Sequence, residues 1–72
     1  MNAEKVAREL LIEECKSKPN EKVLFAGRVF TYAELAQALE GREVSAFDAF
    51  RFTYVRKCAE SLVQSLKKIL ER

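Results

Sequence analysis

The chain has 72 residues, enough for one domain with a small core, and its 49% hydrophobic and 33% charged residues are typical of a folded protein rather than a disordered one. Its 13 basic and 11 acidic residues give a net charge of +2, which by itself indicates neither a nucleic-acid nor a membrane partner. No run of about 18 apolar residues suits a membrane span, and the N-terminus lacks the apolar core of a signal peptide. We therefore expect one intracellular, cytoplasmic domain over residues 1–72.

Residues 1–18 are predicted to contain the first helix. Asn2 is a suitable N-cap, and Lys16 and Lys18 lie where the helix dipole favours cations. Ile12 falls outside the apolar stripe, so it is either a single exposed apolar residue or part of a second contact surface. The stripe expected to face the core consists of Ala3, Val6, Ala7, Leu10, Leu11 and Cys15.

Residues 22–32 are predicted to form a β-hairpin, because Pro19 and Asn20 end the first helix and the apolar residues then alternate. Gly27-Arg28 suits a two-residue type II′ loop. That loop would pair Phe25 with Phe30 and Val23 with Tyr32, placing all four side chains on one face. Since a two-stranded hairpin is marginal alone in water, we expect this face to pack on helices.

A short helix is expected over residues 33–40. Thr31-Tyr32-Ala33-Glu34 has the form of a capping box, and Gly41 provides a C-terminal stop. Over residues 28–36 the sequence resembles the entry to the DNA-binding helices of alkyltransferase-like proteins, and its Thr-Tyr-x-Glu-Leu run resembles one in adenylate-forming enzymes. The first family needs a histidine that this chain lacks, and the second spans several hundred residues, so we expect neither activity.

A long helix is predicted over residues 45–72, with Ser45 as N-cap and Asp48 three positions later. No Gly or Pro interrupts residues 46–72, and about 27 residues at roughly 1.5 Å each would make a rod on the order of 40 Å long. The fold class is thus α+β in the order α-β-β-α-α, with a two-stranded antiparallel hairpin packed on helices. The line expected to face the core is Phe47, Tyr54, Cys58, Leu62 and Ile69.

The apolar arc of this last helix is wider than one covering layer needs. It extends over on the order of 200°, against roughly 100° for a one-sided surface helix. Either the rest of the chain covers the whole arc or a second copy covers one side, and the few remaining elements favour the second copy. The predicted interface residues are Phe52, Val63, Leu66 and Leu70. The function expected is that of a protein-interaction or scaffolding module that forms a homodimer through this helix.

An enzyme, a metal site and a cofactor are not expected. The only cysteines are Cys15 and Cys58 and histidine is absent, which excludes four-ligand zinc sites and Cys–His or Ser–His catalysis. We expect both thiols to be buried as small hydrophobic groups rather than paired in a disulfide. The carboxylates suit solvated helix faces and turns, and Gly27 and Gly41 form no phosphate-binding loop.

The alternative function is a small helix-turn-helix regulator that binds nucleic acid. The two C-terminal helices flank a turn at Gly41, and the hairpin would serve as a wing. The candidate contacts are Arg42, Arg51, Arg56 and Lys57. The basic residues of the long helix scatter over its faces, which favours solvated edges over a phosphate-reading surface. Arg51 falls within the apolar arc, so it must either extend to solvent or pair with a carboxylate.

Overall fold

The first helix, α1, spans Ala3–Ser17 in the computed structural model, which describes residues 2–42 and 49–72. The Asn2 side chain accepts a hydrogen bond of 3.1 Å from the backbone N–H of Lys5, confirming the predicted N-cap. Ala7 and Cys15 are buried, but Leu10 is exposed, so the prediction that Leu10 faces the core is wrong. Ile12 packs against the core in its place, because the buried face is centred closer to Cys15.

A two-stranded antiparallel hairpin follows, with β1 spanning Lys22–Phe25 and β2 spanning Arg28–Thr31. Phe25 pairs with Arg28 and Val23 with Phe30, so the predicted register and the Gly27-Arg28 loop are wrong. The loop is Ala26-Gly27, with φ of 52° and 74°, and two positive φ values are typical of a type I′ turn. The shift is two residues, which preserves side-chain alternation. Val23, Phe25 and Phe30 therefore still share one face, and all three contact the core.

The turn carries a backbone strain that a substitution can relieve. Ala26 is the only non-glycine with positive φ among the described residues, and an L-residue there costs roughly 1–2 kcal/mol relative to glycine, offset in part by the greater unfolded-state entropy of glycine. We expect Ala26→Gly to raise the free energy of unfolding by about 0.5–1 kcal/mol in urea denaturation. Gly27→Ala should lower it by about 1 kcal/mol. A Cβ at Gly27 meets nothing within 4 Å, so an unchanged stability would contradict the backbone explanation.

Helix α2 spans Tyr32–Leu39 and begins with the predicted capping box. The backbone N–H of Glu34 donates to Thr31 Oγ1 at 3.2 Å, and the backbone N–H of Thr31 donates to Glu34 Oε1 at 3.2 Å. The helix ends in a Schellman motif, since Arg42 N–H donates to the Gln37 carbonyl and Gly41 N–H to the Ala38 carbonyl. Gly41 has φ of 72°, which confirms its role as the stop.

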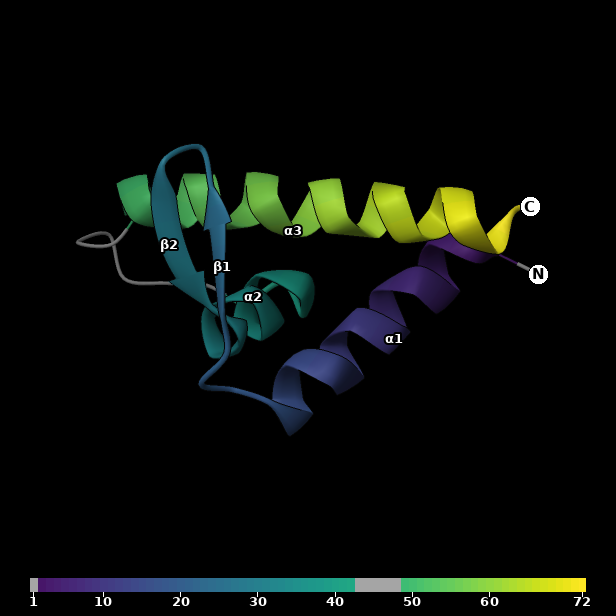
Figure 1. Cartoon of the computed structure of the whole chain (residues 1–72), viewed down its shortest axis with the longest axis horizontal. Coiled ribbons are helices and arrows are strands. Elements are labelled where there is room, and N and C mark those ends of the chain that lie inside the picture. Colours follow the sequence, from purple (N-terminus) through teal and green to yellow (C-terminus); the bar gives the residue numbers. More distant parts are fainter. Residues whose placement is uncertain (1, 43–48) are drawn as a thin grey trace.

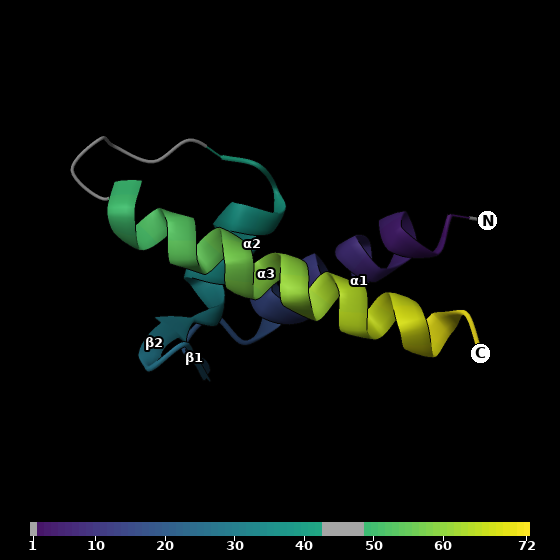
Figure 2. The same cartoon turned by 90° about the horizontal axis from the view of Figure 1, so that it is seen from above.

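The last helix, α3, spans Ala49–Leu70 and runs along the longest dimension of a 39 × 23 × 21 Å molecule (Figure 1). The predicted N-cap Ser45, with Phe47 and Asp48, lies outside the described residues. Helix α1 starts near the C-terminal end of α3 and diverges from it, and α2 lies between them (Figures 1 and 2). The order α-β-β-α-α and the α+β class are confirmed.

The core lies where α1, α2 and the hairpin meet one side of α3. Its fully buried large side chains include Phe30, Leu35, Val55 and Val63. The most buried line of α3 passes through Val55, Ala59 and Val63. Ile69 is exposed, so the prediction that Ile69 faces the core is wrong. Cys58 is buried and Tyr54 and Leu62 pack against the core, so these three residues of the predicted line do contact it.

Candidate functional site

A cleft of about 320 Å³ opens between α1, the C-terminal end of α2 and α3. Three arginines from three different segments border it: Arg8 from α1, Arg42 after α2 and Arg56 from α3. Phe52 and Leu39 provide apolar lining, and Glu60 is the one carboxylate among the described lining residues. We call this feature the arginine cleft.

Arg8 is the fixed member of the arginine cleft. Its Nη2 donates to both carboxylate oxygens of Glu60, at 2.9 and 3.1 Å, and its Nη1 donates to the Leu39 carbonyl at 3.5 Å. The Glu4 carboxylate lies 3.9 Å from the same Nη2. These contacts join all three helices and fix the orientation of the guanidinium. A planar guanidinium is held in place by several charge-assisted hydrogen bonds more firmly than the flexible ammonium of a lysine would be.

Arg42 and Arg56 are held more loosely. The Schellman motif fixes the backbone of Arg42, while its Nη2 lies 3.7 Å from Glu40, and its side chain is largely exposed. The Arg56 guanidinium carbon lies 6.0 Å from the centroid of the Phe52 ring, and among the described residues no carboxylate pairs with Arg56. The described lining residues thus include three guanidinium groups and one carboxylate, and the Glu4 and Glu40 carboxylates lie beside Arg8 and Arg42 without lining the cleft.

The four predicted nucleic-acid contacts do not share one surface. Arg42 and Arg56 meet at the arginine cleft, and Arg56 and Lys57 border a second, shallower depression. Arg51 lies apart, because it points toward the hairpin and α2. Sequence reasoning missed Arg8, which looks like an ordinary solvated helix charge until the fold brings α1 beside the end of α2.

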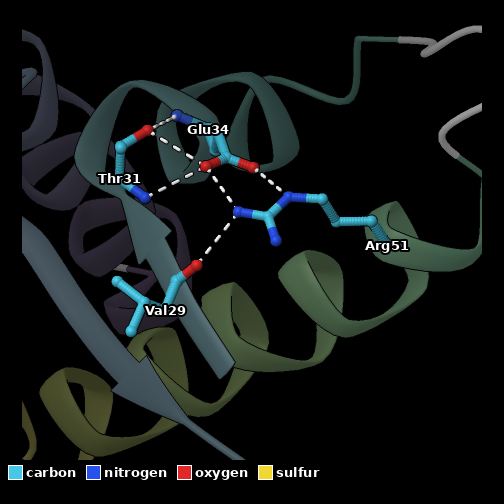
Figure 3. Close-up of polar contacts among 4 residues, drawn as sticks. All are labelled: Val29, Thr31, Glu34 and Arg51. Carbon is cyan, nitrogen blue, oxygen red and sulfur yellow. Dashed lines mark hydrogen bonds and ion pairs between the residues drawn. The ribbon is translucent and has the colours of Figure 1, made fainter. Parts of the chain in front are cut away.

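Arg51 pairs with a carboxylate of another element, which is one of the two arrangements expected from its position in the apolar arc (Figure 3). Its Nε donates to Glu34 Oε2 at 2.8 Å, and its Nη2 donates to Glu34 Oε1 at 2.9 Å and to the Val29 carbonyl at 3.0 Å. The guanidinium carbon also lies 4.9 Å from the Phe30 ring centroid. This clamp of Arg51 on Glu34 and Val29 ties the start of α3 to the capping box of α2 and to β2.

The four predicted dimer-interface residues lie mostly in or against the core. Val63 has no exposed surface, so it contacts no partner in the folded chain. Phe52 and Leu66 are half-buried and pack against the core, and only Leu70 is largely exposed. The chain itself therefore covers most of the surface that the sequence assigned to a second copy.

Other apolar side chains are exposed instead. Leu24 and Val29 are cross-strand partners on the outer face of the hairpin, with 71% and 51% of their surfaces exposed. Phe50 is 67% exposed and packs edge-on to Tyr54, with Arg28 over both rings. The remaining exposed large apolar residues in the described part of the chain are Leu10, Ile69 and Leu70. The alternation of side chains along β1 could have predicted that Leu24 is exposed, because Leu24 lies on the opposite face of the strand from Val23 and Phe25.

Both thiols are free and buried, which confirms the expectation for Cys15 and Cys58. Burial raises the pKa of each thiol, and for Cys15 the neighbouring Glu14 and Cys58 raise it further. A thiol with a raised pKa in an apolar core is a poor nucleophile.

Metal and membrane sites find no support over residues 2–42 and 49–72. No three Cys, Asp or Glu side chains in these ranges gather closely enough to hold a metal ion. None of the helices formed by these residues has the length and apolar character required to cross a bilayer.

No protein-family model matches the chain, and no curated protein or solved structure is significantly similar to it.

Proposed function

We propose that this chain is a protein-interaction module that forms a homodimer by pairing the β1 strands of two copies. The observation that carries the proposal is the exposure of Leu24 and Val29, two adjacent apolar side chains on the outer face of a hairpin. The inner face of this hairpin packs on the core, so Leu24 and Val29 lie on the face that the described part of the chain leaves exposed. The proposal retains the predicted dimer but moves its interface from the long helix to the hairpin.

The two edges of the hairpin differ in how they are protected. The Val29 carbonyl points away from β1, because it accepts a hydrogen bond from Arg51, and this contact occupies the outer edge of β2. In an antiparallel pair, two residues opposite each other either both point their N–H and C=O groups toward the neighbouring strand or both point them away from it. The N–H and C=O of Leu24, opposite Val29, therefore point outward from β1. An outward-facing strand edge with an exposed apolar side chain is a template for pairing with another chain.

Two copies fit this edge with a two-fold axis through Leu24. In that arrangement Leu24 lies opposite the partner's Leu24 and exchanges two backbone hydrogen bonds with it. Lys22 lies opposite the partner's Ala26, so no like charges face each other. The outer face of the resulting four-stranded sheet carries an unbroken apolar row, formed by Val29 and Leu24 of each copy.

Sedimentation velocity at about 100 μM tests the proposal, with an expected mass of twice the 8.3 kDa chain. We expect Leu24→Lys to yield monomers with unchanged circular dichroism, because a lysine on an edge strand opposes pairing and Leu24 contributes little to the core. The matched control is Ile69→Lys, which places the same charge on an exposed apolar site of α3 and should leave the dimer intact.

Two results would contradict the proposal. A wild-type monomer at this concentration would remove the dimer. Loss of the dimer in Ile69→Lys but not in Leu24→Lys would place the interface on the long helix, as the sequence analysis expected.

A further inference from the structure

We propose that the arginine cleft binds the phosphate group of a small phosphate ester. Among the described residues the cleft is lined by three guanidinium groups and one carboxylate, and it is a hollow of about 320 Å³ rather than an open surface. Guanidinium groups suit phosphate because their N–H donors match its oxygens in paired, planar hydrogen bonds. The hairpin contributes no residue to the cleft, so the inference is independent of the proposed dimer.

The arrangement of the arginines separates one structural role from two binding roles. Arg8 is engaged by Glu60 and the Leu39 carbonyl, and these contacts hold its guanidinium at the cleft. Arg56 has no carboxylate partner among the described residues, and the contact of Arg42 with Glu40 is long at 3.7 Å and largely exposed. The fold thus requires neither of these two side chains, and both remain available to an anion.

The backbone at the end of α2 does not repel an anion strongly, although helix C-termini carry partial negative charge. The Leu39 carbonyl accepts from Arg8, and the Gln37 and Ala38 carbonyls accept the two bonds of the Schellman motif. These three carbonyl groups at the end of α2 are therefore occupied by donors, which reduces the negative potential that a phosphate would meet there.

The shape and the apolar lining favour an ester over a nucleic-acid backbone. Phe52, Leu39 and Ala38 line the cleft beside the arginines, so an apolar or aromatic ester group has a surface to contact. A nucleic-acid backbone presents a phosphate at every nucleotide and needs a row of cations. The neighbouring cations do not form one, because Arg51 is clamped toward the hairpin and Lys57 lies 5.7 Å from the Tyr54 ring centroid.

Two-dimensional NMR of the full chain, including the arginine Nε–Hε signals, tests the proposal by titration with phenyl phosphate and inorganic phosphate. We expect saturable shifts at Arg8, Arg42 and Arg56, with phenyl phosphate binding about tenfold more tightly because its ring contacts the apolar lining. Arg42→Gln and Arg56→Gln should each weaken phenyl phosphate about tenfold while leaving thermal unfolding unchanged. Arg28→Gln, which removes the same charge outside the cleft, should leave binding within twofold.

Three outcomes would overturn the inference. One is the absence of saturable shifts with phenyl phosphate up to 20 mM. Another is an equal loss in Arg28→Gln, which would indicate general charge attraction. The third is tight, salt-sensitive binding of a single-stranded or duplex DNA oligonucleotide without phenyl phosphate binding, which would assign the arginines to a nucleic-acid backbone.

Discussion

Replacing Phe30 with alanine is expected to lower the free energy of unfolding by about 3–5 kcal/mol, the usual cost of deleting a buried aromatic side chain. Phe30 lies on the inner face of β2 and is fully buried, and the Arg51 guanidinium lies over its ring. Small domains have net stabilities of only a few kcal/mol, so a large part of the chain should unfold at 25 °C. Urea denaturation followed by circular dichroism measures the change.

Phe50→Ala is the matched control for Phe30→Ala, because it deletes the same ring at an exposed position. Phe50 contacts the edge of Tyr54 and the Arg28 guanidinium, contacts that each contribute about 0.5–1 kcal/mol at exposed sites. We expect a loss of about 1 kcal/mol or less for Phe50→Ala. Equal losses in the two variants would show that Phe30 is not the centre of the hairpin contact.

Glu34→Ala is expected to cost about 2 kcal/mol, the second largest effect. The substitution removes the carboxylate that receives Arg51 and one half of the capping box at Thr31. A cap contributes about 1 kcal/mol, and an ion pair with this much solvent exposure contributes at most about 1 kcal/mol. Glu34→Gln keeps an acceptor for Thr31 and should lose only about half as much. Equal losses in the two substitutions would contradict a separate contribution of the cap acceptor, and an unchanged stability in Glu34→Gln would contradict a role for the charge.

The Arg51–Glu34 pair also predicts how stability depends on pH. The hydrogen bond from Arg51 is the largest cause that holds the pKa of Glu34 below its ordinary value, and bonds from Thr31 lower it further against the opposing effect of burial. The resulting stability is complete above the ordinary pKa of a glutamate and is lost as the pH falls through the lowered pKa. The stability difference between wild type and Glu34→Gln should therefore shrink between pH 6 and pH 3. A constant difference would show that ionisation of Glu34 contributes nothing.

For the hairpin, the prediction of which side chains face the core is correct although the predicted register is wrong. Alternation alone placed Val23, Phe25 and Phe30 on one face, and this face does contact the core. The loop was misplaced because Gly-X and X-Gly pairs both suit tight turns, and the structure uses a positive φ at Ala26 that alanine does not favour. Since a shift of two residues keeps the same side chains inward, burial of the apolar face does not distinguish the two registers.

For the long helix, the apolar residues were recognised but the side of the helix that faces the core was not. Its wide apolar arc was apparent from spacing, but the centre of the buried face lies through Val55, Ala59 and Val63 rather than through Tyr54 and Ile69. At 100° per residue the mean directions of the two lines differ by a rotation of roughly 100°. An arc this broad lets the core be centred at any point within it. The choice depends on where α1, α2 and the hairpin contact the helix, and this converts three predicted interface residues into core contacts.

The sequence by itself determined the element order, both helix caps at Asn2 and Thr31, the stop at Gly41 and the burial of the cysteines. Each of these follows from local chemistry, because a cap or a Schellman glycine acts on backbone groups within a few residues. Only the tertiary structure decided the hairpin register, the buried side of α3 and the meeting of Arg8, Arg42 and Arg56 at one cleft. The three arginines are 14 to 48 positions apart in the chain, and only packing sets the distances between them.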